Sequence, residues 1–248
     1  NTPLLYKKIG ENMQVILEEE VPIVFTSAGN PKTWTAKLQD AGRVVVHVVS
    51  NVRFAEKSAA AGCDAVVAEG FEAGGHNGRE EITTLVLIPQ VRAAVDVPVL
   101  AAGGIGSGAA MLAAMALGAD GVQIGSRFVA SEESSAHAAF KEKVVEAGPG
   151  DTMLSLKALT PVRLLKNKFF QEVRDLEQGG ASTEALREHL GRGRSRIGMF
   201  EGNMEDGELE IGQISGAIRE VLPAAAIMQE ILTEYAQLKL DISQGGRY

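Results

Sequence analysis

Residues 64–78 read DAVVAEGFEAGGHNG, an apolar run followed by a loop that contains four glycines. The run at Ala65–Glu69 is typical of a strand buried on both faces of a parallel sheet. Glycines let the backbone after such a strand approach a flat or charged ligand closely. His76, in the same loop, is the one nearby side chain that titrates near neutral pH. A ligand-binding loop with a proton-transfer group predicts an enzyme site.

Runs rich in Val, Ile and Ala recur along the first part of the chain, with amphipathic segments between them. Their starts are spaced roughly every 20 residues, with one interval of about 33 that contains the glycine-rich loop, which is the scale of βα units. The expected strands are Ile23–Ser27, Val44–Val49, Ala65–Glu69, Val99–Ala102 and Gly121–Ile124, and the expected helices are Thr33–Ala41, Arg53–Ala61, Thr84–Ala94 and Gly108–Leu117. This alternation predicts an α/β protein with a parallel sheet, either a TIM (β/α)8 barrel or an open doubly wound sheet.

Polar residues or glycines stand at the carboxyl ends of nearly all these strands, which favours the barrel. They are Ser27, His47, Glu69, Gly103 with Gly104, and Gln123 with Gly125 and Ser126. A barrel gathers such residues at one mouth, whereas an open sheet concentrates them at one switch point. His47 is expected inside the barrel as a hydrogen-bonded structural residue.

The start of the chain bears on whether the barrel closes. Five strands are clear, and a sixth is expected to end at Asn1. Two βα units and the start of a third are then missing for an eight-stranded barrel, so we expect about 70 further residues upstream of Asn1. A smaller open sheet is the alternative.

The pattern changes after about residue 150, where the strand-like runs disappear. We therefore expect a (β/α) barrel over residues 1–150 and, over residues 151–248, a helical extension that covers or flanks the barrel mouth. The expected parts of the extension are helices at Val162–Gln178, Thr183–Leu190 and Ile211–Gln237, the last broken near Pro223, an ordered loop at Gly191–Glu210 and a frayed tail at 244–248.

Composition narrows the classes of function. The chain has 248 residues, 45% of them hydrophobic, and a net charge of −8, which argues against nucleic acid and anionic membranes as main partners. Cys63 is the only cysteine, so no intramolecular disulfide can form, which fits a cytoplasmic location. No apolar run reaches the length of a membrane span, and the histidines and the cysteine lack metal-ligand spacing.

Two successive glycine turns are candidates for binding a phosphate. Gly103 and Gly104 follow the strand at Val99–Ala102, and Gly125 and Ser126 follow the next strand. In a barrel, backbone N–H groups in the loops after the seventh and eighth strands often bind an anion. The alternative is that these glycines only form tight turns.

Three other side chains could contact the rest of such a ligand. Glu69 and Gln123 end their strands and can hydrogen-bond a ring edge or ribityl hydroxyls. For Glu69, a salt-bridged carboxylate at the rim is equally consistent with the sequence. His76 is expected to be accessible on its loop, and the alternative is a surface imidazole with no task.

Three motifs, in this order, resemble the flavin-dependent nitronate monooxygenase (2-nitropropane dioxygenase) family. They are Glu69–Gly78, Ala101–Ile105 and Gln123–Phe128, and the resemblance covers most of the chain. Similarity to the enoyl-[acyl-carrier-protein] reductase II branch of the family is carried by Thr83–Val86, Ser135–Lys143, Val162–Asn167 and Ile211–Gly216. The family's first two βα units, with a Gly-Gly-Met flavin-binding segment, have no counterpart here.

The resemblance implies a TIM barrel that binds FMN without a covalent link. The cofactor-binding positions that it implies are Asn1, Glu69, Gly74, Gly75, Gly103, Gly104, Gln123, Ile124, Gly125 and Ser126. Ser126 replaces the threonine usual in the family and keeps the hydroxyl group. His76 matches the family's active-site histidine.

The function that the resemblance favours is reduction of an enoyl thioester in fatty acid synthesis. NAD(P)H reduces FMN, hydride then passes to the β-carbon of the substrate, and His76 is the expected proton donor to the α-carbon. The alternative is a nitronate monooxygenase, in which FMN and O2 oxidise alkyl nitronates without NAD(P)H. A second alternative is a non-catalytic barrel fragment that has lost its cofactor.

The expected partners are a small-molecule or acyl-carrier-protein-bound enoyl substrate and a second copy of the chain in a homodimer. Fatty acyl carrier protein is acidic, so its docking should need basic residues. The candidate group is Arg163, Lys166, Lys168, Arg192, Arg194 and Arg196. An ordinary solvated surface is the alternative for that group.

Overall fold

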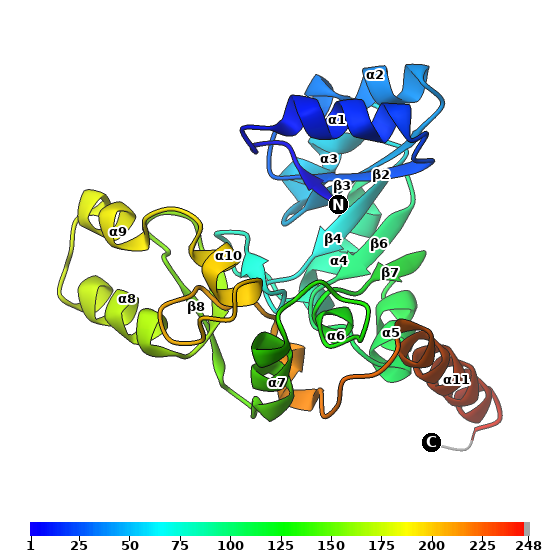
Figure 1. The fold of residues 1–248 in the computed structure, drawn as a ribbon. Coiled ribbons are helices and arrows are strands. Elements are labelled where there is room, and N and C mark those ends of the chain that lie inside the picture. Colours follow the sequence, from blue (N-terminus) through cyan, green and yellow to red (C-terminus); the bar gives the residue numbers. More distant parts are fainter. Residues whose placement is uncertain (246–248) are drawn as a thin grey trace. The chain divides into compact units, whose positions relative to one another are not determined.

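A computed structural model describes residues 1–245 of the chain (Figure 1). The described residues form two compact units. Unit 1 contains Asn1–Gly70, Ile82–Ala102 and Ala114–Gln123, and unit 2 contains Phe71–Glu81, Gly103–Ala113 and the chain from Ile124 onward. The domain boundary expected near residue 150 stays a prediction. The frayed tail expected at 244–248 falls largely on residues 246–248, which lie outside the described residues.

Unit 1 is built on a six-stranded parallel sheet with the order β1-β2-β3-β4-β6-β7. The strands are β1 (Thr2–Pro3), β2 (Ile23–Ser27), β3 (Val44–Val49), β4 (Ala65–Glu69), β6 (Val99–Ala102) and β7 (Gly121–Gln123). Each strand of this sheet pairs with the next one along the chain, which is the strand order of a (β/α) barrel. The predicted α/β fold class, with parallel strands in barrel order, is confirmed. Within residues 1–245, β1 and β7 form the two edges of the sheet.

The sequence located these strands closely because each is a short, largely apolar run. The bounds predicted for β2, β3, β4 and β6 are confirmed, and β7 ends one residue earlier than expected. The sixth strand, β1, pairs with β2 through Thr2 and Pro3. Asn1 therefore precedes this strand, and the expectation that it ends the strand is wrong.

Helices between the strands complete unit 1. They are α1 (Ile9–Glu18), the 3₁₀ helix η1 (Pro31–Thr33), α2 (Thr35–Asp40), α3 (Val52–Ala60) and α4 (Thr84–Ala94), while α5 (Gly108–Ala116) contributes residues to both units. The helix expected over Thr33–Ala41 begins instead as η1, because Pro31 and the Asn30 side chain favour a tight first turn that Trp34 ends. Helix α1 was not predicted, although it buries Met13 completely.

The helix-covered face of the sheet carries a core cluster. Val66 of β4 and Val99 of β6 pack there with side chains of α3 and α4. His47 of β3 pairs with Val66, so it shares this face and does not lie inside the barrel as expected. A hydrogen bond of 2.7 Å joins its Nδ1 to Thr26 Oγ1, and burial lowers the pKa of His47 to about 4. His47 is therefore a neutral structural residue at pH 7.

The opposite face of the sheet has its own apolar cluster, formed by side chains of the strands. Val67 and Ala102 pack there with Phe25 and Leu100. Along β4, side chains alternate between the faces, so Glu69 lies on the same face as Val67. This face corresponds to the interior of a barrel, and on β4 its last residue at the carboxyl end is the polar Glu69.

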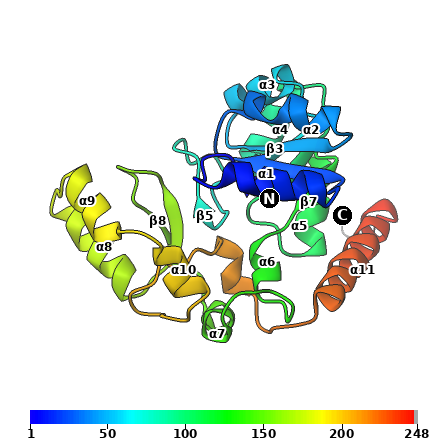
Figure 2. The ribbon, with the colours of Figure 1, turned by 45° about the horizontal axis from the view of Figure 1, so that its top comes forward.

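Unit 2 contains a three-stranded antiparallel sheet with the order β5-β9-β8 and most of the remaining helices. The strands are β5 (Gly75–His76), β8 (Thr152–Ser155) and β9 (Val162–Leu165), and the helices are α6 (Ser126–Val129), α7 (Ala138–Glu146), α8 (Lys168–Gln178), α9 (Thr183–Leu190), α10 (Arg194–Met199), the 3₁₀ helix η2 (Gln213–Ala217) and α11 (Ala224–Ser243). Figures 1 and 2 show α8 and α9 side by side. No helix within residues 1–245 has both the length and the apolar character needed to cross a bilayer.

Several expectations for this part of the chain are wrong. Strands do occur after residue 150, and the helix predicted over Val162–Gln178 is the strand β9 followed by α8. All four residues of β9 are buried, so its sequence lacks the alternation that identifies a half-exposed strand. The first part of the helix predicted over Ile211–Gln237 is the 3₁₀ helix η2, whereas the break expected near Pro223 is confirmed, because Pro223 is the N-cap of α11. The loop expected at Gly191–Glu210 contains α10, whereas the helix at Thr183–Leu190 is confirmed.

Candidate functional site

Three residues at the carboxyl ends of neighbouring strands form a row across the sheet of unit 1. Glu69 of β4 pairs with Ala102 of β6, and Ala102 pairs with Gln123 of β7. Residues that pair across a parallel sheet point to the same face. The side chains of Glu69 and Gln123 therefore lie on the same face of the sheet, with β6 between their two strands. The register brings together two of the predicted cofactor-binding residues.

Within the described residues, the Gln123 side chain of this row lacks a polar partner for its Oε1, and Glu69 lies in an environment that favours its neutral form. Gln123 Oε1 is buried and accepts no hydrogen bond from residues 1–245. Burial raises the pKa of Glu69 to about 7, and no ion pair within the described residues supports the salt-bridged alternative for this carboxyl group. A buried acceptor without a donor is costly. The row therefore fits a ligand that supplies N–H or O–H groups, such as a ring edge or ribityl hydroxyls.

The two glycine turns belong to unit 2, and their backbones differ from ordinary turns. Gly103 and Gly104 have φ values of +89° and +70°, a conformation that side chains other than glycine rarely adopt. Gly125 has open space where a Cβ would stand, with no atom within 4 Å. A ligand can therefore approach the backbone of Gly125 closely.

The two turns contact the same loop. A Cβ on Gly104 would lie 3.3 Å from Glu72 Cβ. The hydroxyl of Ser126 accepts a hydrogen bond of 2.9 Å from the N–H of Gly212, and a Cβ on Gly212 would lie 2.9 Å from the carbonyl oxygen of Glu72. Gly104 thus lies next to Glu72, and Ser126 is linked to the same loop through Gly212, while a phosphate site shared by the two turns stays a prediction. The Ser126 hydroxyl retains its own proton as a donor.

Chain packing supplies a reason for the next two glycines. A Cβ on Gly74 would lie 2.4 Å from the carbonyl carbon of Ile211, and one on Gly75 would lie 2.5 Å from Glu210 Oε2. Gly75 also has a φ of +72°. These positions therefore need glycine whether or not a ligand is present. Their predicted contact with a cofactor stays a prediction.

For Asn1 and Ile124, the remaining residues predicted to bind the cofactor, the structure shows only their place and exposure. Asn1 is exposed at the position before β1, and Ile124 is partly buried between Gln123 and Gly125. No side-chain hydrogen bond in the described residues assigns either one a structural role. Their proximity to a cofactor also stays a prediction.

His76 faces a cavity in unit 2. It lies on β5, where it pairs with Val162 of β9, and the Asn77 side chain holds this loop by donating to the carbonyl oxygens of Ala73 (3.0 Å) and Gly75 (2.9 Å). The exposed His76 side chain borders a cavity of about 190 Å³. The apolar wall of the cavity consists of Leu156, Leu159, Val162 and Leu190. This places the only predicted catalytic residue beside an apolar space, as proton transfer to a hydrophobic substrate requires.

Two carboxyl groups near His76 were not predicted from the sequence. Glu208 lines the cavity and is 7% exposed. Burial, followed by repulsion from Glu210, raises the pKa of Glu208 to about 7, while the charge of Arg194 opposes this shift. Burial also raises the pKa of Glu210, against the effect of His76. Residues 206–210 read DGELE, so three of the five are acidic. Nothing in this stretch of sequence indicates that the carboxyl groups of Glu208 and Glu210 are buried.

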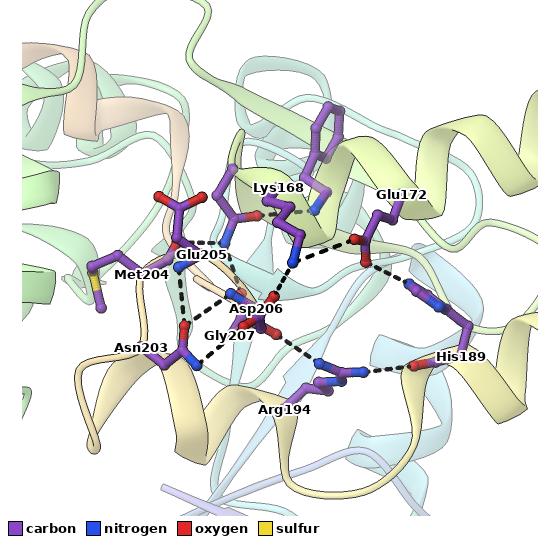
Figure 3. Close-up of polar contacts among 11 residues, drawn as sticks. Lys168, Glu172, His189, Arg194, Asn203, Met204, Glu205, Asp206 and Gly207 are labelled. Atoms are coloured by element: carbon purple, nitrogen blue, oxygen red, sulfur yellow. Dashed lines mark hydrogen bonds and ion pairs between the residues drawn. The ribbon is translucent and has the colours of Figure 1, made fainter.

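Arg194 is held by main-chain carbonyl groups next to this cavity (Figure 3). Its Nε donates to Leu190 O (3.1 Å), its Nη1 to Asp206 O (2.9 Å) and its Nη2 to His189 O (3.1 Å). The guanidinium also lies over the ring of Phe169, 5.2 Å from the centroid. Arg194 therefore fixes the cavity wall, and its donors are committed to backbone.

The basic group suggested for carrier-protein docking is largely engaged within the chain. Arg163 is 2% exposed and donates twice to Phe71 O, at 3.0 and 2.7 Å. Lys168 pairs with Asp206 at 2.7 Å, and Arg196 pairs with Glu201 at 2.9 Å. Lys166 donates to Gly150 O. Carboxylates therefore pair with two of the six residues, Lys168 and Arg196, and Arg163 is buried, while docking of a carrier protein stays a prediction.

Asn167 links the start of α8 to the loop at residues 203–207. Its side chain caps α8 by accepting from Phe170 N (2.9 Å), and it donates to Met204 O and Gly207 O, both at 2.8 Å. We expect Asn167→Ala to lower the free energy of unfolding by about 2 kcal/mol, because a cap and two partly buried hydrogen bonds are lost. The comparison variant is Asn203→Ala, which removes the hydrogen bonds that Asn203 Oδ1 accepts from Glu205 N and Asp206 N in the same exposed loop. Equal thermal midpoints for Asn167→Ala and the unmodified protein would contradict this prediction.

Comparison with known proteins identifies the family. The sequence model for nitronate monooxygenase matches residues 5–234. A probable nitronate monooxygenase of Staphylococcus aureus is 31% identical over 241 residues, covering 92% of this chain and 66% of the relative. The chain belongs to the nitronate monooxygenase family, and it spans just under two thirds of the length of this relative.

Solved structures are also similar to this chain. FabK from Thermotoga maritima is 39% identical, with a TM-score of 0.91, covering 98% of this chain and 76% of that one. Nitroalkane oxidase from Streptomyces ansochromogenes is 31% identical, with a TM-score of 0.79, covering 94% of this chain and 70% of that one. Both similarities extend over the strands and helices of both units, so the fold resembles two flavin-family enzymes with different named activities.

Proposed function

We propose that this chain is part of an FMN-dependent enoyl-[acyl-carrier-protein] reductase that uses NAD(P)H. The observation that carries the proposal is the 39% identity to FabK, an enoyl-acyl-carrier-protein reductase II, over 98% of the chain. The apolar cavity bordered by His76 supports it, because an enoyl group is apolar and its reduction needs a proton donor. The substrate is a small enoyl thioester or its carrier-protein form.

FMN fits the residues present. Gly103, Gly104, Gly125 and Ser126 would hold its phosphate through main-chain N–H groups and one hydroxyl. Gln123, whose buried Oε1 lacks a donor within the described residues, and Glu69 would meet the ring edge or the ribityl hydroxyls. When bound, the flavin supplies hydride transfer. The chain's own residues orient the substrate, exclude water from the leucine-lined space and deliver a proton from His76.

Nitronate oxidation is the second candidate, favoured by the names of the curated relatives and of the nitroalkane oxidase structure. In that reaction His76 would orient the nitronate or assist proton removal. The two candidates differ in what they consume, since the oxidation requires O2 and no NAD(P)H.

Absorption spectroscopy with purified protein tests both candidates. We expect a yellow protein after reconstitution with FMN, which NADPH bleaches without air and crotonyl thioester then recolours. Turnover of alkyl nitronates only, and only with O2, would reject the reductase. A colourless protein that does not take up FMN would support the non-catalytic fragment.

A further inference from the structure

Glu208 is an unpartnered carboxyl group in the cavity that His76 borders. It is 7% exposed, and within residues 1–245 no hydrogen bond or ion pair to its side chain accompanies that burial. Ionised carboxylates are rarely buried without such partners. An unpartnered buried carboxyl group that opens onto a cavity indicates a ligand with a complementary atom.

The backbone of Glu208 is fixed, so its side chain has a defined position. Its N–H donates to Arg194 O (3.0 Å), and the next residue, Leu209, accepts from Leu165 N (2.9 Å). A Cβ on Gly198 of α10 would lie 2.8 Å from Glu208 O, so α10 packs directly on this strand-like segment. A side chain on such a support can recognise a ligand precisely enough for catalysis.

Burial and the charge of Glu210 favour the neutral form of Glu208, whereas the charge of Arg194 opposes it. Arg194 is the cation whose charge acts on Glu208, and three of its N–H groups bind the carbonyl oxygens of Leu190, Asp206 and His189. Glu210, on the same segment, repels a second negative charge. His76 borders the cavity from β5, and the wall also contains leucine and valine side chains, two glycines, Thr160 and Ser195. Apolar enzyme sites can keep a carboxylic acid protonated so that it donates a hydrogen bond.

We propose that Glu208 is a substrate-binding residue whose neutral carboxyl group donates a hydrogen bond to the carbonyl oxygen of the enoyl thioester. The proposal rests on the reductase function proposed above. A neutral carboxyl group offers one O–H donor, and the carbonyl is the strong acceptor next to the reacting carbons of such a substrate. Negative charge grows on that oxygen as the β-carbon is reduced, so the hydrogen bond strengthens in the transition state. The cavity of about 190 Å³ suits the short reacting end of the thioester.

The kinetic test compares Glu208→Gln and Glu208→Leu in the FMN-loaded protein with crotonyl thioester. The neutral acid is present below a pKa of about 7 and is lost as the pH rises through it. We expect Gln, a weaker donor that does not titrate, to lower kcat/KM by about 3–10-fold and to remove one ionisation from the high-pH side of the profile. Leu, which cannot donate, should lower kcat/KM by about 100-fold. Glu205→Gln, an exposed carboxylate on the preceding loop, should behave as the unmodified protein.

A binding measurement separates this inference from the proposed function. Infrared difference spectra should contain a protonated-carboxyl band near pH 6 that is absent in Glu208→Gln and shifts when crotonyl thioester is added. A shift without any turnover would reject the reductase function and keep the Glu208 contact. An unshifted band, or an unchanged kcat/KM in Glu208→Leu, would overturn the proposal.

Discussion

His76→Ala should lower enoyl-thioester turnover by about 10²–10⁴-fold, the usual contribution of general acid catalysis. The side chain is exposed at the edge of the cavity, so its removal leaves the packing of β5 against β9 in place. We therefore expect FMN to remain bound and NAD(P)H to reduce it at the original rate. The loss should appear only in the half-reaction that consumes the enoyl thioester.

Stopped-flow absorbance of the two half-reactions is the decisive measurement for His76. His76→Gln is the matched comparison, because glutamine keeps a polar side chain of similar reach but cannot supply a proton near neutral pH. Both variants should be slow in enoyl reduction if proton transfer matters. Unchanged turnover in His76→Ala would show that His76 is not the proton donor. Failure of the variant to bind FMN would show that His76 has a structural role instead.

Gly74→Ala should lower the free energy of unfolding by about 3 kcal/mol, an overpacking effect on rigid neighbours. The added Cβ would lie 2.4 Å from Ile211 C, 2.5 Å from Gly212 N and 2.6 Å from Ile211 Cα. All three atoms are main chain, so no side chain can rotate away. The loop can move only by breaking contacts such as the hydrogen bond from Gln213 N to Glu72 O (2.9 Å).

Gly10→Ala is the control for the Gly74 variant. A Cβ on Gly10 meets nothing within 4 Å, and the residue lies in helix α1, where alanine is favoured over glycine by about 1 kcal/mol. Thermal unfolding should therefore show a lower midpoint for Gly74→Ala and an equal or higher one for Gly10→Ala. A Gly74→Ala protein as stable as the unmodified chain would mean that this loop does not pack on Ile211 and Gly212.

The strands of unit 1 could be predicted from the sequence because their signal is local. Runs such as Val44–Val49 and Ala65–Glu69 are apolar apart from His47 and Glu69 and are bounded by turns, which is sufficient to identify buried parallel strands. The same property misled the prediction at β9. Val162–Leu165 is also buried throughout, and it is apolar apart from Arg163. It lies directly before a true helix, so periodicity could not separate the two.

The candidate site was predictable only in part. The glycines at positions 103 and 104 indicated a tight turn after the strand, and both residues have positive φ values. His47 was predicted on the barrel-interior face of the sheet, but it lies on the helix-covered face. Its face depends on its pairing with Val66, which cannot be read from the sequence. Glu208 was missed because its burial depends on α10 and β9, which are separated from it along the chain.

By itself, the sequence determined the strand and helix periods of unit 1, the glycine positions and the family motifs, because these depend on neighbours within a few residues. Only the tertiary structure decided that Gly74 faces Ile211, that Glu69 and Gln123 share a row, and that Glu208 is buried beside His76. Burial and electrostatic environment are properties of groups brought together from distant parts of the chain. A carboxyl group therefore acquires its pKa, and with it its chemical role, only after the chain has folded.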